Sequence, residues 1–146
     1  MGSNIAIPAT VKVGTRYRAK LYVQKGAAGA NASSLTLRAG ANSTVSDPSI
    51  ATFSYGTATA AADNGRFEVD AVFTATGASA AVYVDFNFIH KLSTTGFSNT
   101  SYNVLANVSS STFNSATAGM VLGLSWNPGG GASANVAGIF TQIENY

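Results

Sequence analysis

Few side chains in this 146-residue chain have the type and spacing that chemistry requires. The chain has one histidine and no cysteine. A zinc centre needs three or four nitrogen, sulfur or oxygen ligands, so we expect no metal and no cofactor. A Ser-His-Asp arrangement would have to use His90, and no Gly-x-Ser-x-Gly motif accompanies it. We therefore expect His90 to be solvated or hydrogen-bonded to a loop.

The one close pair of carboxylates on a common strand face is Glu68 and Asp70. Glycosidases use two carboxylates about 5–9 Å apart. The two residues alternate with apolar ones, however, which places both on a solvent face where acidic residues are ordinary. Asp85, which lies between Tyr83 and Asn87, could contact a sugar or another subunit. The sequence therefore predicts that the protein is not an enzyme and has no catalytic residues.

A cluster of basic residues is the first candidate for a binding surface. Arg16, Arg18 and Lys20 alternate with core-type residues, so all three project from one side of a strand. Five of the eight basic residues fall within the first 25 positions, which predicts a positive potential on one side of the molecule: Lys12, Arg16, Arg18, Lys20 and Lys25. Docking to an acidic partner is one interpretation. A solvated face that discourages edge aggregation is the other.

Four aromatic residues in expected loops or at strand ends form the second candidate, a ligand-contact group of Tyr55, Phe97, Tyr102 and Trp126. Trp126 ends an apolar strand, so it is interpreted first as a core or sheet-end residue and second as a platform for a sugar.

Alternation with period two predicts the elements that position these residues. We expect about eight strands, over 15–24, 34–39, 50–55, 66–75, 80–90, 102–108, 119–126 and 135–145. Turn residues separate them, as at Asp63-Asn64-Gly65. The sequence predicts a single domain over residues 1–146, an all-β, antiparallel, eight-stranded sandwich of two sheets. A jelly roll is its simplest form, and an immunoglobulin-like sandwich is the alternative.

Composition narrows the function classes. Charged residues make up 10% of the chain, against a usual ~25%, while hydrophobic residues make up 46%. That hydrophobic content argues against disorder. The formal charge of +2 is too small to indicate a nucleic-acid partner, and no apolar run approaches the ~18 residues of a membrane span.

The order of segments resembles a small β-sandwich domain of tailed-phage virion proteins, found in head fibres, capsid decoration proteins and tail appendages. The resemblance covers almost the whole chain and rests on residues 13–18, 35–40, 66–77, 122–126 and 140–144, which read VGTRYR, LTLRAG, RFEVDAVFTATG, LGLSW and FTQIE. The chain departs from this pattern after Trp126, where Asn127-Pro128 and three glycines replace a short Ser/Ala stretch.

The resemblance implies a non-enzymatic structural protein, a decoration or head-fibre subunit on the capsid surface or the tail. Its implied partners are the major capsid protein or another virion protein, together with copies of the chain itself, with a trimer favoured. The absence of cysteine agrees with assembly in the reducing cytoplasm of a host. The alternative is a receptor- or carbohydrate-binding module of a fibre or tail, with a host-surface glycan as partner.

Overall fold

The protein is a sandwich of two antiparallel sheets. The computed structural model describes residues 4–27, 29–54, 56–92, 94–97, 103–127 and 134–144. Its strands are β1 (Ile5–Ala6), β2 (Arg16–Lys25), β3 (Ser34–Gly40), β4 (Ser49–Ser54), β5 (Asp63–Ala75), β6 (Ala81–His90), β7 (Asn103–Ser109), β8 (Val121–Asn127) and β9 (Ala134–Glu144), with a 3-10 turn at Gly77–Ser79. None of the helical structure in these residues is long enough to cross a membrane.

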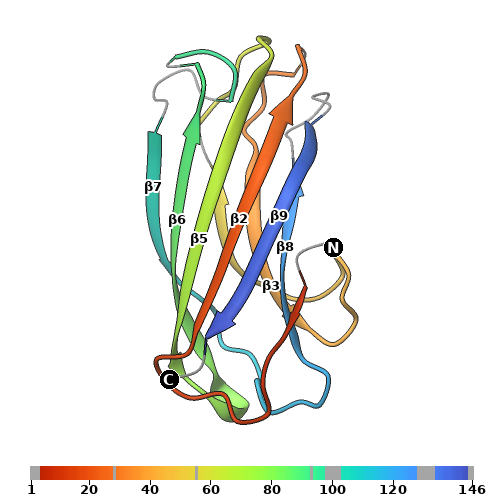
Figure 1. The fold of residues 1–146 in the computed structure, drawn as a ribbon, viewed down its shortest axis with the longest axis vertical. Coiled ribbons are helices and arrows are strands. Elements are labelled where there is room, and N and C mark those ends of the chain that lie inside the picture. The colour runs from red at the N-terminus through yellow and green to blue at the C-terminus, as the bar shows by residue number, and fades with distance from the viewer. Residues whose placement is uncertain are drawn as a thin grey trace.

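The strands are divided between a four-stranded sheet in the order β1-β8-β3-β4 and a five-stranded sheet in the order β7-β6-β5-β2-β9. In Figure 1 the five-stranded sheet faces the viewer and the other sheet lies behind it. The prediction of an all-β, two-sheet antiparallel sandwich is confirmed, and β2 to β9 correspond to the eight expected strands. The two-residue β1, which pairs with β8, was not expected. The jelly-roll form of the sandwich stays a prediction.

Alternation along the strands produces the core. In β2 the burial pattern changes at every residue, with Tyr17, Ala19, Leu21 and Val23 buried. Aromatic rings from different strands fill the space between the sheets. Phe53 of β4 lies 5.7 Å from Phe86 of β6, which joins the two sheets, and Phe67 of β5 stacks 4.2 Å from Phe88 of β6. Aromatic pairs of this kind contribute beyond the area that they bury.

We expect Tyr17 to make the free energy of unfolding depend on alkaline pH. The side chain is fully buried, and burial raises the pKa of its phenol well above the usual value of 10.0. The folded state therefore keeps a proton that the unfolded state loses above pH ~10. The stabilisation from this group is complete below that pH and falls by about 1.4 kcal/mol per pH unit above it. Replacing Tyr17 with Phe should remove this fall in urea unfolding curves measured across the alkaline range.

The comparison must be variant against parent, because Lys25 acts in the opposite direction. Burial lowers the pKa of Lys25, so its contribution to stability rises as pH approaches the unfolded-state value. Both proteins contain Lys25, and the difference between them isolates the phenol. Identical alkaline slopes in the two proteins would show that Tyr17 is not the group responsible.

Candidate functional site

The outer face of the five-stranded sheet, hereafter the outer face, carries side chains in four rows that cross the strands. Strand register defines the rows. The first contains Tyr22, Arg66 and Ile89, and the second contains Lys20, Glu68, Asn87 and Leu105. The third contains Gln142, Arg18, Asp70, Asp85 and Asn107, and the fourth contains Glu144, Arg16, Val72, Tyr83 and Ser109. The two middle rows are mostly charged or amide residues, and each end row has a tyrosine.

Cations and carboxylates lie next to each other in these rows. All four cations of the outer face are ion-paired, with nitrogen–oxygen distances of 3.0 Å for Arg16–Asp70, 3.3 Å for Arg18–Asp70, 3.6 Å for Arg18–Glu144, 3.2 Å for Lys20–Glu68 and 3.5 Å for Arg66–Glu68. Each exposed pair contributes only about 0–1 kcal/mol to stability. The ion pairs have a larger effect on the electrostatic potential of the outer face, because carboxylates on the neighbouring strands β5 and β9 neutralise the cations of β2.

These ion pairs correct the prediction that this side of the molecule has a positive electrostatic potential. Arg16, Arg18 and Lys20 do share one side of β2, as predicted, but they do so beside an equal number of carboxylates. Lys25 is not on the surface at all, with 2% of its area exposed. The sequence shows which residues alternate. It does not show which strands lie beside them.

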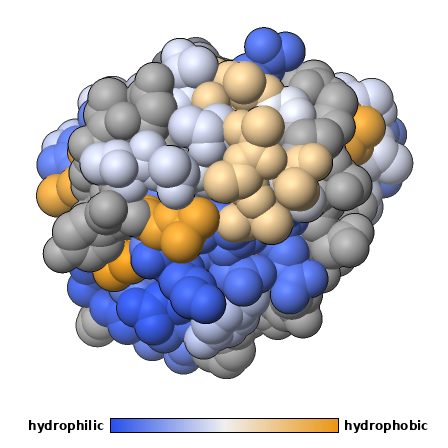
Figure 2. Space-filling model, turned by 90° about the horizontal axis from the view of Figure 1, so that it is seen from above, coloured by the Kyte–Doolittle hydropathy of each residue, from blue (hydrophilic) through white to orange (hydrophobic). Residues whose placement is uncertain are grey.

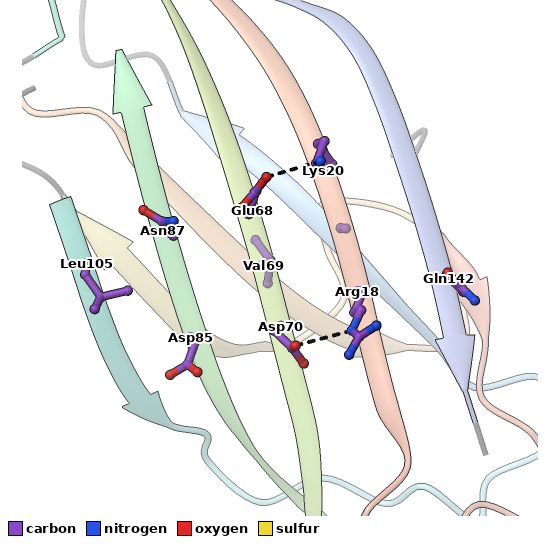
Figure 3. Close-up of a pocket in the computed structure, with 10 residues that line it drawn as sticks. Arg18, Lys20, Glu68, Val69, Asp70, Asp85, Asn87, Leu105 and Gln142 are labelled. Carbon is purple, nitrogen blue, oxygen red and sulfur yellow. Dashed lines mark hydrogen bonds and ion pairs between the residues drawn. The ribbon is translucent and has the colours of Figure 1, made fainter. Parts of the chain in front are cut away.

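A hollow of about 620 Å³ lies over the second and third rows (Figure 3). Among its lining residues, Asp85 and Asn87 project from β6, and their side chains have no hydrogen bond or ion pair with any other described residue. Asp85 also stands directly opposite Asp70 in the register. Like charges in that position are unfavourable. Because Asp70 is already paired with two arginines, Asp85 is the uncompensated carboxylate of the hollow.

A second hollow of about 370 Å³ continues the outer face at the first row. Tyr22, Arg66, Ile89 and Lys91 are among its lining residues, and Tyr22 is 48% exposed. The Arg66–Glu68 ion pair joins a residue of this hollow to one of the first. The two hollows therefore adjoin along β5.

Two of the four predicted ligand-contact aromatics, Phe97 and Trp126, lie in or against the core. Phe97 is fully buried and packs edge-to-face on Phe88, with ring centroids 5.3 Å apart. Trp126 is partly buried against the core, 5.3 Å from Phe67 and 6.0 Å from Phe97. Phe97 is therefore a core residue, and Trp126 has the core role that was its first interpretation. Tyr55 and Tyr102 lie outside the described residues.

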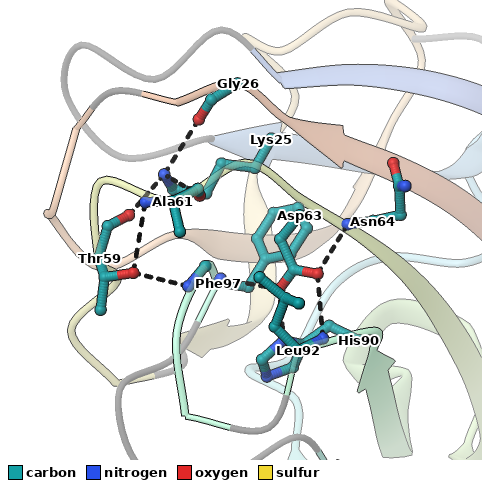
Figure 4. Close-up of polar contacts among 10 residues, drawn as sticks. Lys25, Gly26, Thr59, Ala61, Asp63, Asn64, His90, Leu92 and Phe97 are labelled. Carbon is teal, nitrogen blue, oxygen red and sulfur yellow. Dashed lines mark hydrogen bonds and ion pairs between the residues drawn. The ribbon is translucent and has the colours of Figure 1, made fainter.

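One end of the sandwich holds a buried polar cluster, formed by Lys25, Asp63 and His90 at the ends of three neighbouring strands (Figure 4). Asp63 Oδ1 accepts from the backbone N–H groups of Asn64 and Leu92. Its Oδ2 accepts from the Phe97 N–H and is hydrogen-bonded to His90 Nδ1 at 2.5 Å. His90 is 3% exposed, so the expectation that it is solvated is wrong. In place of solvent, its Nδ1 is hydrogen-bonded to Asp63, which the sequence places in a turn and the structure makes the first residue of β5.

Lys25 binds loop backbone in the same cluster. Its Nζ donates to the carbonyl oxygens of Gly26, Thr59 and Ala61, at 3.2, 2.7 and 3.3 Å. Burial lowers the pKa of Lys25, and the charge of Asp63 partly opposes this effect. Gly96 closes the cluster with a φ of +82°, and a Cβ there would lie 2.2 Å from Asp63 Oδ2. The cluster is thus a structural device that ties loops to the sheet.

Figure 2 shows the same end of the molecule from above. A hydrophilic area lies beside residues of intermediate hydropathy, and the strongly hydrophobic areas are smaller. Among the described residues, no three His, Asp or Glu side chains gather closely enough to hold a metal ion. On the outer face, by contrast, a hollow and the polar side chains of Asp85 and Asn87 come together.

Comparison of the chain with protein-family models, with curated proteins and with solved structures finds no match.

Proposed function

We propose that the protein is a non-enzymatic structural subunit of a phage virion, a capsid decoration or head-fibre protein, which attaches to the particle through the outer face. The distribution of charge carries this proposal. The chain has eight basic and six acidic residues, and eight of these fourteen lie on the outer face. Of the other six, Lys25, Asp47 and Asp63 are buried. Directional contacts with a partner are therefore concentrated on one surface.

The remaining parts of the proposal follow from the phage resemblance. The partner is the major capsid protein or another virion protein, and the subunit assembles in the host cytoplasm and is displayed on the capsid surface or tail. Copies of the chain also associate with one another, with a trimer favoured, since closed symmetry is general among homo-oligomers. Light scattering that gives a monomer mass, both in solution and after release from particles, would contradict the self-association.

Attachment should weaken when the basic residues of the outer face are removed. In the triple variant Arg16→Ser, Arg18→Ser, Lys20→Ser, attachment should fall by ~1–3 kcal/mol, because each exposed charge contributes about 0–1 kcal/mol. The loss should shrink at high salt, which screens exposed charges. Cosedimentation with empty shells of the phage that encodes the chain measures it.

Lys12→Ser provides a matched control, because Lys12 is exposed and lies outside the strands of the outer face. It should attach as the parent does. Thermal unfolding should show that all variants remain folded. If the triple variant cosediments as well as the parent at low salt, the outer face is a solvated surface and does not dock.

A receptor- or carbohydrate-binding module is the second candidate function, and the two hollows favour it. Binding sites for small ligands are concave and present a few polar groups that fix orientation. The outer face combines such concavity with unpaired polar side chains at Asp85 and Asn87.

A further inference from the structure

We infer that the two adjoining hollows of the outer face bind a neutral oligosaccharide, which lies along β5 from Tyr22 to Asp85. This inference rests on the second candidate function and names its ligand class. It stands on three independent features of the outer face, namely its free hydrogen-bonding groups, its exposed aromatic ring and its balance of charge.

The free hydrogen-bonding groups match the hydroxyl groups of a sugar. Each hydroxyl both donates and accepts, and the Asp85 carboxylate accepts while the Asn87 amide does both. Neither side chain is engaged by another described residue, and both line the first hollow. On the opposite side of the hollow, the ion pairs Arg18–Asp70 and Lys20–Glu68 hold further polar groups in fixed positions. Groups held in place in this way lose little freedom on binding.

The exposed aromatic ring provides an apolar surface for the C–H face of a sugar. Tyr22 is 48% exposed and lines the second hollow. The residue paired with Tyr22 in β9 is Gly138. The row of Tyr22 and the row of Asp85 are separated by four residues along a strand, which corresponds to about 14 Å at ~3.4 Å per residue. That length requires more than one sugar ring.

The balance of charge favours a neutral ligand over an acidic one. Of the four cations that line the two hollows, Lys91 in the second has no ion pair with another described residue, whereas both cations of the first hollow, Arg18 and Lys20, are already paired with carboxylates. An anionic sugar there would have to compete with those carboxylates and would also meet the uncompensated charge of Asp85. A neutral sugar avoids both costs, because it exchanges hydrogen bonds without adding charge.

Isothermal titration of the whole chain with defined hexasaccharides tests the inference. The neutral probes are hexaoses of β-1,3-glucan, β-1,4-glucan, α-1,4-glucan, xylan and mannan, and the acidic probes are hexasaccharides of alginate and hyaluronan. At least one neutral probe should bind. Asp85→Ala should weaken its binding about tenfold, the usual effect of losing a hydrogen bond to a charged acceptor, and Tyr22→Ala should weaken it by a similar factor.

Tyr83→Ala is the matched control, because Tyr83 is an exposed tyrosine of the same outer face that lines neither hollow. Its affinity should equal that of the parent. Binding of acidic probes alone, binding of no probe, or equal losses in Tyr22→Ala and Tyr83→Ala would each overturn the inference. Shell cosedimentation of the same variants separates the two proposals. If a parent chain binds shells but no sugar, the virion function stands and the oligosaccharide site does not.

Discussion

Replacing Phe88 with Ala should lower the free energy of unfolding by about 3–5 kcal/mol, the range for large aromatic residues removed from a core. Phe88 is fully buried and contacts Phe67, Phe97 and the ring of His90, with centroids 4.2, 5.3 and 5.5 Å away. Gly65 lies against its ring and has no side chain that could move into the space. We therefore expect a loss toward the upper end of that range, measured by urea unfolding.

Gly65 makes this prediction specific. A Cβ at this position would lie 2.5 Å from Phe88 Cε2, so Gly65→Ala alone should cost ~1–3 kcal/mol through overpacking. In the Phe88→Ala background the added methyl enters the vacated space, and its cost should largely disappear. This non-additivity is the signature of direct contact. Strictly additive losses would mean that the two residues do not pack as described. Tyr83→Ala, on the exposed side of the same strand, should cost far less.

Replacing Asp63 with Asn should lower the free energy of unfolding by about 3–5 kcal/mol, as when one partner of a buried charge pair is removed. Each carboxylate oxygen of Asp63 has two hydrogen-bond partners, and three of the four are backbone N–H donors. An amide keeps one acceptor oxygen and turns an NH₂ group toward donors. The variant also leaves the buried Lys25 without its nearby negative charge.

Asp85→Asn is the isosteric control for this prediction. Asp85 is exposed and stands opposite Asp70, so removing its charge should change the free energy of unfolding by less than ~0.5 kcal/mol or raise it slightly. Equal losses in Asp63→Asn and Asp85→Asn would contradict a special role for the buried carboxylate.

Alternation predicted which side of the strands 15–24, 34–39, 66–75 and 80–90 faces the core, but it misplaced strand ends. The strand expected at 66–75 is β5, which begins at Asp63, and the strand expected at 15–24 is β2, which extends to Lys25. At those ends Asp63 and Lys25 have the same parity as the buried residues, and so does His90. This shared alternation was the signal in the sequence that the three residues are buried. It was missed because Asp63-Asn64-Gly65 has the residues of a turn, whereas Gly65 is required by its contact with Phe88.

The arrangement of the outer face could be predicted only in part. The common side of Arg16, Arg18 and Lys20 follows from alternation, and so does that of Glu68 and Asp70. Their ion pairs, and the row that brings Asp85 beside Asp70, depend on which strands are neighbours and in what register. These are long-range properties that a local pattern does not contain. Phe97 looks like a loop residue in the sequence, and it is buried against the rings of Phe88, His90 and Trp126.

We propose that the outer face is the surface through which the protein binds its partner. This proposal is tested by acetylating the lysines of protein attached to shells and of free protein, and by measuring the modification of each lysine by mass spectrometry. Lys20 lies on the outer face, and Lys12 is exposed outside it. We predict that attachment protects Lys20 several-fold and leaves Lys12 as reactive as in the free chain. Unchanged reactivity of Lys20 on attached chain, or protection of Lys12 alone, would contradict the claim.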